Sequence, residues 1–172
     1  MRRIRYCVAM SLDGYIAGPH DEADWIVMDP DMNFAALWAQ FDTLLMGRRT
    51  YDAAISRLGP SAMRGTSVVV ASRTLRHEDH PDITIIPDLN RRELEALRQS
   101  GHKDIWMMGG GEIFRYLLTL QQVDSVEVSI VPILLGSGIP LLPFLETRTP
   151  LALTAHKVYR SGVVSLTYEI GH

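Results

Sequence analysis

Cysteine is almost missing from this chain of 172 residues, since Cys7 is the only one. A single thiol cannot form an internal disulfide, and it cannot supply the thiolates of a Cys₄ or Cys₂His₂ zinc site. The six histidines show no metal-ligand spacing, so we expect no metal centre. No apolar run approaches the roughly 20 residues that span a bilayer, and the first residues do not read as a signal peptide. We therefore expect a cytoplasmic protein without a membrane partner.

An excess of charge of one sign is also missing. Seventeen basic residues face 20 acidic ones, and the formal net charge is −3. Surfaces that bind a polyanion are usually strongly basic, so nucleic acid is not an expected partner. What is present is an ordinary core composition, with 47% hydrophobic residues, in a length that suits one domain over residues 1–172.

Strand-like and helix-like segments alternate along most of the chain. Strands are predicted at 3–10, 43–46, 67–71, 83–86, 104–108 and 124–131, and helices at 31–41, 50–58, 91–100 and 112–120. After residue 120 only strands follow, and 151–159 and 163–170 are joined by a hairpin-sized turn. The pattern predicts an α/β fold of three layers, with a mostly parallel central sheet, an antiparallel C-terminal edge and helices on both faces.

The strongest local motif is a run of three glycines, Gly109 to Gly111, between an apolar strand and a helix that begins near Glu112 and Ile113. Glycines let a ligand approach the backbone, and a helix N-terminus offers unpaired N–H groups with a partial positive charge. A tight turn is the alternative interpretation, but two glycines would suffice for one. Neither the dinucleotide fingerprint nor the P-loop spacing is met, so the motif favours anion binding without naming the ligand.

Two further strand ends carry hydroxyl groups and arginines. They are Gly47, Arg48, Arg49 and Thr50 at one strand end, and Ser72 and Arg73 at another. Arginines at a helix N-terminus oppose the helix dipole unless an anion is present. Ligands of open α/β sheets bind at the carboxyl ends of the strands, so the three junctions should meet in one crevice. Separated phosphates and the lack of an acidic residue for a ribose hydroxyl favour NADPH over NADH.

The candidate acids lie in the long loop at 11–30 and just after it. They are Asp13, Asp21, Glu22, Asp24, Asp29 and Asp31. We expect Asp31 to be the catalytic carboxyl, because it begins an apolar helix where partial desolvation would raise its pKa and let it hold a proton. A plain helix N-cap at Asp29 or Asp31 is the alternative. Trp25 and Phe34 are expected to form apolar walls for the substrate.

Four segments in order, 10–18, 42–51, 108–112 and 132–141, resemble motifs of the dihydrofolate reductase-like superfamily. The last of them is similar to the C-terminal reductase domain of the riboflavin-biosynthesis deaminase-reductase. This resemblance implies a dihydrofolate reductase-like fold, a homodimer, NADPH as cofactor and a cis bond between Gly109 and Gly110. It implies that Ala9 and the Ile16 to Gly18 loop hold the nicotinamide end, and it places the carboxylate of the active site at Asp31.

The same resemblance assigns the remaining cofactor contacts. Gly47 to Thr50 with Ser72 and Arg73 would hold the adenosine phosphate, and Gly109 to Ile113 the pyrophosphate. The implied activity is that of an NADPH-dependent reductase that passes a hydride to a C=N or C=O carbon of a small pterin- or pyrimidine-like heterocycle, similar to 5-amino-6-(5-phosphoribosylamino)uracil reductase. Dihydrofolate reductase activity, a non-catalytic nucleotide-binding protein and an interaction module built on the C-terminal hairpin are the alternatives.

Overall fold

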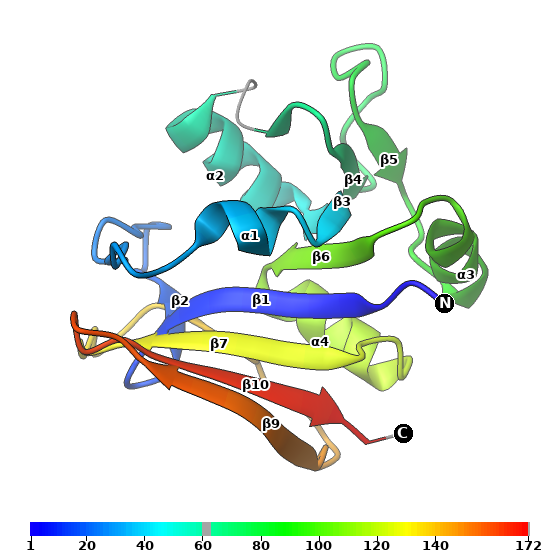
Figure 1. The fold of residues 1–172 in the computed structure, drawn as a ribbon. Helices are drawn as coiled ribbons and strands as arrows, with labels where there is room; N and C mark the ends of the chain where they lie inside the picture. Colours follow the sequence, from blue (N-terminus) through cyan, green and yellow to red (C-terminus); the bar gives the residue numbers. More distant parts are fainter. Residues whose placement is uncertain (60–62, 172) are drawn as a thin grey trace.

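The centre of the molecule is an eight-stranded sheet with the order β5-β4-β3-β6-β1-β7-β10-β9, shown in Figure 1. The computed structural model describes residues 1–59 and 63–171. The strands of this sheet are β1 (Ile4–Ser11), β3 (Phe41–Gly47), β4 (Ser67–Ala71), β5 (Thr84–Ile86), β6 (Asp104–Gly109), β7 (Ser125–Val131), β9 (Leu151–Val158) and β10 (Val164–Ile170). β10 runs antiparallel to β7 and β9, whereas the other strands pair in parallel. The predicted sheet is thus confirmed.

Helices cover both faces of this sheet. They are α1 (Phe34–Trp38), α2 (Arg48–Leu58), α3 (Arg91–Gln99) and α4 (Gly111–Thr119). Side chains alternate along each strand. Tyr6 and Met107 therefore pack with residues of α3 and α4, whereas Leu44 and Trp106 pack with residues of α1 and α2. The expected three layers are confirmed, because each face has its own buried apolar cluster.

The predicted helix at 31–41 is wrong at both ends. α1 begins after Asn33, whose side-chain oxygen accepts a hydrogen bond from the Ala36 N–H at 2.9 Å and caps the helix. Neither Asp29 nor Asp31 is the cap. At the other end Phe41 pairs with Asp104 of β6, so it belongs to β3. The apolar stripe continues from a helix into a strand, and the tertiary pairing decides where the helix ends.

A second, two-stranded sheet was not predicted from the sequence. β2 (Tyr15–Ala17) and β8 (Ile139–Pro140) pair in antiparallel fashion beside the end of β1. Gly138 precedes β8 with a φ of +155°, and a Cβ there would lie 2.2 Å from the carbonyl oxygen of Ala17. Only glycine fits so close a backbone approach. This small sheet brings residues of the first loop and of the segment after β7 to the same end of the molecule.

The opposite end of the large sheet is held by the side chain of Arg2, which is buried. Its guanidinium donates to the Leu97 carbonyl at 2.8 Å and to the Thr43 hydroxyl at 2.6 Å. It also donates to the Asp42 carboxylate and to the Lys103 carbonyl. One side chain therefore joins β1, the start of β3, the end of α3 and the start of β6.

Two kinds of feature are missing from residues 1–59 and 63–171, the ranges that the structure describes. No helix in them combines the length and the apolar character of a membrane span. No three His, Cys, Asp or Glu side chains gather there as a group that could hold a metal ion.

Candidate functional site

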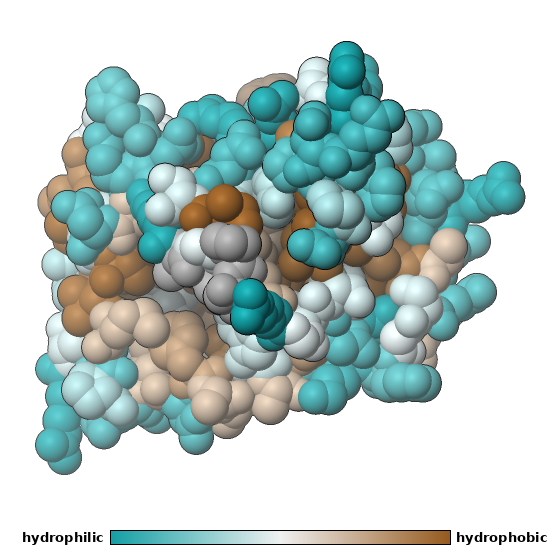
Figure 2. All heavy atoms as spheres, turned by 90° about the horizontal axis from the view of Figure 1, so that it is seen from above, coloured by the Kyte–Doolittle hydropathy of each residue, from teal (hydrophilic) through white to brown (hydrophobic). Residues whose placement is uncertain are grey.

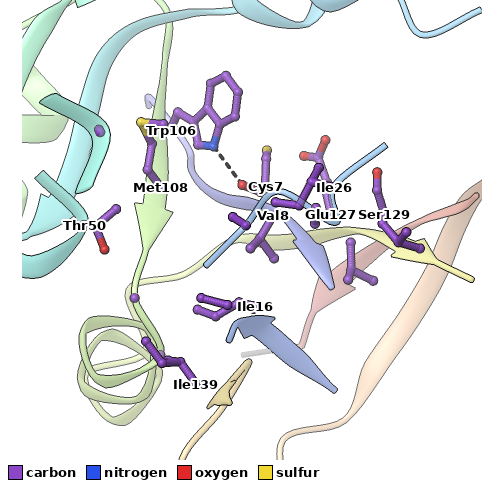
Figure 3. Close-up of a pocket in the computed structure, with 18 of the residues that line it drawn as sticks. Cys7, Val8, Ile16, Ile26, Thr50, Trp106, Met108, Glu127, Ser129 and Ile139 are labelled. Atoms are coloured by element: carbon purple, nitrogen blue, oxygen red, sulfur yellow. Dashed lines mark hydrogen bonds between the residues drawn. The ribbon is translucent and has the colours of Figure 1, made fainter. Parts of the chain in front are cut away.

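A cavity of about 1200 Å³ lies at the carboxyl ends of β1, β3, β6 and β7. Its walls are mostly apolar, with Ile16, Ile26 and Trp106 among the lining residues, and Figure 3 shows these three around the central space. Figure 2 shows the molecule from the α1 and α2 side, where apolar residues gather within a largely hydrophilic surface. The cavity occupies the place that open α/β sheets use for ligands.

One end of the cavity is formed by the N-termini of two helices. Gly47 is the N-cap of α2 and Gly110 the N-cap of α4, and neither helix start has a side-chain capping hydrogen bond. A Cβ on Gly110 would lie 3.7 Å from the Thr50 hydroxyl oxygen, so the two helix starts face each other closely. Unpaired N–H groups and two helix dipoles thus point into one space. This arrangement is suited to a phosphate group.

Arginine and hydroxyl groups extend this end toward β4. The Arg48 guanidinium donates to the Thr74 hydroxyl at 2.6 Å. Ser72 is buried, and its hydroxyl oxygen accepts hydrogen bonds from the N–H groups of Thr74 at 3.2 Å and Leu75 at 3.1 Å. Arg73 is exposed beside them. The second and third junctions expected from the sequence are therefore adjacent in space.

Most of the expected cofactor and substrate residues line the cavity. Those that do are Ala9, Ile16, Phe34, Gly47, Arg48, Arg49, Thr50, Gly110, Gly111, Glu112 and Ile113. Those outside the lining are Gly18, Trp25, Asp31, Ser72, Arg73 and Gly109. The peptide bond between Gly109 and Gly110 is cis, as the resemblance implied. Gly18 and Trp25 both bond within the first loop, to the carbonyl of Glu22.

The desolvation expected of Asp31 is wrong. Its side chain is 58% exposed, and its nearest cation is Arg160, with 3.8 Å between Nε and Oδ2. Because α1 begins three residues later than expected, Asp31 lies in the preceding loop and outside the cavity lining. Its catalytic role stays a prediction.

Two other candidate acids are Asp29 and Asp13. Their side-chain carboxylates accept hydrogen bonds from backbone N–H groups. The Asp29 carboxylate is buried and accepts from the N–H groups of Ser161 at 2.9 Å and Asp31 at 2.8 Å. Hydrogen bonds from Ser161 hold the pKa of Asp29 below its usual value. The pKa of Asp13 is lowered in the same way, by hydrogen bonds from the Ser11 hydroxyl and the Gly136 N–H. Asp29 thereby fastens the loop before α1, which forms one cavity wall, to the β9–β10 turn.

Glu127 is a cavity residue that the sequence analysis missed. It lies on β7, lines the cavity and has a side chain only 17% exposed. Arg5 binds both of its oxygens, with Nε to Oε1 at 2.5 Å and an Nη to Oε2 at 2.8 Å. The sequence does contain a signal for a strand with one polar face, because polar and apolar residues alternate in Ser-Val-Glu-Val-Ser-Ile-Val.

Cys7 and Asp21 also line the cavity. Burial and the nearby Glu127 carboxylate raise the pKa of the Cys7 thiol well above its usual value, so it stays protonated. The Asp21 carboxylate pairs with Arg49 at 3.0 Å, and its carbonyl accepts from Arg57. Asp21 therefore joins the first loop to α2.

Comparison with known protein families gives one match over nearly the whole chain. The family model described as RibD C-terminal domain matches residues 2–165. Two Bacillus subtilis (strain 168) proteins are similar in sequence. The uncharacterized protein YyaP is 33% identical over 179 residues, covering 98% of this chain and 95% of its own length. The uncharacterized protein YwjB is 28% identical over 161 residues and covers 91% of both.

Solved structures share the fold. A putative riboflavin biosynthesis protein from Shewanella sp. PV-4 has a TM-score of 0.85 and 27% identity, with 100% of both chains covered. Dihydrofolate reductase from Enterococcus faecalis, complexed with NADP(H), has a TM-score of 0.68 and 14% identity, covering 99% and 97%. The diaminohydroxyphosphoribosylaminopyrimidine deaminase/5-amino-6-(5-phosphoribosylamino)uracil reductase of Thermotoga maritima has a TM-score of 0.72 and 14% identity over 99% of this chain and 57% of that one. At 14% identity these last two likenesses concern the fold alone.

Proposed function

Because the chain belongs to the RibD C-terminal domain family, we propose that it is an NADPH-dependent reductase acting on a C=N or C=O carbon of a small heterocycle. The family and the dihydrofolate reductase-like fold, both expected from the sequence, are confirmed, and they support a reductase-type function. One observation carries the choice of cofactor. Two helix N-termini without side-chain caps open into the same cavity, beside Arg48.

The residues present fit such a dinucleotide. The N–H groups at the start of α4 would bind the pyrophosphate, and Gly110 places no side chain between the helix starts. Arg48, with Ser72 and Arg73 at the end of β4, would bind the 2′-phosphate. When bound, the dinucleotide supplies the hydride, while the protein positions the two reactants. The apolar side chains of Ile16 and Trp106 would help to exclude water from the bound reactants.

Replacement of Arg48 by alanine tests the phosphate assignment. A charge-assisted hydrogen bond to phosphate contributes roughly 1.5–3 kcal/mol, so we expect NADPH to bind about 10- to 100-fold more weakly and NADH to bind almost unchanged. Titration calorimetry with both nucleotides measures the difference. Arg91→Ala, at the start of α3 on the other face of the sheet, is the matched control and should alter neither affinity. Equal affinity of the unmodified protein for NADH and NADPH would contradict the assignment of Arg48 to the 2′-phosphate.

A nucleotide-binding protein without catalysis is the competing function, because it would keep the same phosphate site. The two are separated by incubation with NADPH and a panel of pterins, pyrimidines and quinones, followed through the absorbance of the reduced nicotinamide. We expect one class of heterocycle to consume NADPH. Tight NADPH binding without consumption by any of them favours the non-catalytic alternative.

The Asp31→Asn variant tests the carboxylate that the sequence favours. A positioned acid or base typically contributes 10²- to 10⁴-fold to turnover, and an amide cannot exchange the proton. Because the Asp31 side chain is exposed and outside the cavity lining, we expect NADPH binding, thermal midpoint and turnover close to those of the unmodified protein. A loss of turnover by a hundredfold or more, with NADPH binding retained, would instead establish Asp31 as the catalytic group.

The homodimer and the cytoplasmic location stay predictions. Sedimentation of the purified protein over a range of concentrations tests the first of them directly.

A further inference from the structure

The hydroxyl group of Tyr6 is buried and has no hydrogen-bond partner, which sets it apart from the other buried side chains that the structure describes. Tyr6 lies in β1, near the middle of the sheet, and is 0% exposed. Burial without a hydrogen bond carries the full desolvation cost of a hydroxyl, so such groups are uncommon in native proteins. The Tyr6 hydroxyl therefore keeps its whole capacity to donate and to accept.

The packing of the Tyr6 ring places this hydroxyl beside the start of α4, which lies behind β1 and β7 in Figure 1. The ring centroid of Tyr6 is 4.2 Å from that of Phe114. The Phe114 N–H donates to the Gly110 carbonyl at 3.1 Å and closes the first turn of the helix. A Cβ on Gly109 would lie 3.8 Å from the Tyr6 hydroxyl oxygen. The hydroxyl thus lies next to the residue that leads into the helix.

There is room for one small group between Tyr6 and Gly109. Gly109 is buried, yet among the described residues beyond its chain neighbours only Tyr6 has atoms within 4 Å of such a Cβ. The φ of Gly109 is +120°, a conformation that residues with a side chain rarely adopt, so this room stays free of a side chain. A buried water molecule needs such room together with polar partners.

The glycine turn separates the Tyr6 hydroxyl from the phosphate end of the cavity. Tyr6 and Gly109 are outside the cavity lining, whereas Gly110 and Gly111 belong to it. The start of α4 has no side-chain cap, and neither glycine of the lining carries a side chain that would block a contact across the turn. A water molecule beside Gly109 would therefore be one residue away from an anion at this helix N-terminus.

The Tyr6 hydroxyl is a neutral donor. Burial raises its pKa well above the usual value, so it keeps its proton at physiological pH. An O–H that donates to a water molecule lets that water donate in turn to an anion, and the bonds of such a chain strengthen one another. The last bond of the chain exists only when the anion is present.

We propose that Tyr6 is a positioning residue of the pyrophosphate site. Its hydroxyl donates to a water molecule beside Gly109, and that water donates to an oxygen of the pyrophosphate. The inference rests on the proposed reductase function and deepens it, because β1 then takes part in cofactor binding through a side chain outside the cavity. Tyr6 thereby contributes to the affinity for a dinucleotide and not to the stability of the ligand-free protein.

Replacement of Tyr6 by phenylalanine keeps the ring that packs on Phe114 and removes only the hydroxyl. We expect calorimetry to show about three- to tenfold weaker binding of NADPH, the effect of one hydrogen bond. Adenosine 2′-monophosphate has no pyrophosphate, and its affinity should change by less than about twofold. The thermal midpoint without ligand should stay close to that of the unmodified protein, because the hydroxyl has no protein partner to lose.

Tyr51→Phe is the matched control. Tyr51 is also buried, but its hydroxyl bonds to the His80 ring at 3.2 Å, and the residue does not line the cavity. Its replacement should lower the thermal midpoint and leave the affinity for both nucleotides unchanged. A loss of NADPH affinity as large as that of Tyr6→Phe would mean that removal of any buried tyrosine hydroxyl disturbs binding, and it would overturn the assignment to Tyr6.

Combination with Gly110→Ala tests whether Tyr6 acts across the glycine turn. A methyl group on Gly110 prevents the close approach of the phosphate, so the hydroxyl should then contribute nothing to binding. In the Gly110→Ala protein we expect Tyr6→Phe to weaken NADPH binding by less than about twofold. Equal factors in the two backgrounds would contradict an action through the pyrophosphate.

A crystal structure of the unmodified protein with NADPH tests the water molecule even where a variant does not fold. An ordered water should lie within about 3.2 Å of both the Tyr6 hydroxyl and a pyrophosphate oxygen. Absence of that water overturns the proposal, and so does unchanged NADPH affinity in Tyr6→Phe. Absence of NADPH binding by the unmodified protein contradicts the reductase proposal itself, whereas NADPH binding without an effect of Tyr6 contradicts this inference alone.

Discussion

Replacement of Gly110 by alanine is expected to weaken NADPH binding by at least about a hundredfold while the protein stays folded. The φ of Gly110 is −86°, and the new Cβ would meet the Thr50 hydroxyl at 3.7 Å, an ordinary contact. The methyl group would, however, occupy the gap between the two helix N-termini. Loss of two charge-assisted hydrogen bonds at roughly 1.5–3 kcal/mol each gives the expected magnitude.

Thermal melting and calorimetry on the Gly110→Ala protein provide the two measurements. Gly111→Ala is the informative comparison, because its Cβ would lie 2.7 Å from the Pro140 carbonyl oxygen and 2.9 Å from a ring carbon of Pro143. That variant should lose stability even without a ligand. NADPH affinity of Gly110→Ala equal to that of the unmodified protein would mean that the glycines serve only the turn.

Removal of the Arg2 side chain is expected to reduce the free energy of unfolding by about 3–5 kcal/mol, the usual cost of breaking a buried ion pair. Truncation leaves the Leu97 carbonyl and the Thr43 hydroxyl without their donor, and the Asp42 carboxylate without its cation. Urea denaturation of Arg2→Ala measures the loss. NADPH binding by the folded fraction should be unchanged, because Arg2 is at the end of the sheet away from the cavity.

Arg3→Ala provides the control for Arg2. Arg3 pairs with Glu169, and both side chains are exposed, so its removal should cost less than about 1 kcal/mol. Equal losses for the two variants would contradict the view that burial, and not the number of ion pairs, gives Arg2 its effect.

The sequence predicted the sheet well because its central strands are short, continuous apolar runs. β4 occupies the predicted residues 67–71, and its middle residues are buried on both faces. The short β2 and β8 have no such run, and their pairing depends on a close approach at Gly138. The local hydrophobic pattern identifies strands whose residues form a continuous apolar run. It does not identify strands whose pairing depends on one tertiary contact.

In the candidate site, too, some features follow from the local sequence and others only from tertiary structure. Glycines and arginines at strand ends predicted that the starts of α2 and α4 would meet at one end of the cavity, because helix N-termini have the same chemistry wherever they occur. The catalytic carboxylate was predicted at Asp31 because a helix was expected to begin there, whereas α1 begins after Asn33. Glu127 could not be separated from an exposed strand residue, since only the fold shows that this face of β7 lines a cavity.

The position of β1 in the sheet has a consequence for the order of folding. Ile4 pairs with Ile105 and Arg5 with Ser125, so both neighbours of this strand come about a hundred residues later in the chain. During synthesis β1 therefore has no partner strand until β6 and β7 have emerged. Closure of such long loops precedes the gain from pairing, which slows folding and leaves an apolar strand open to aggregation. Fragments that end before β6 should consequently fail to form the sheet.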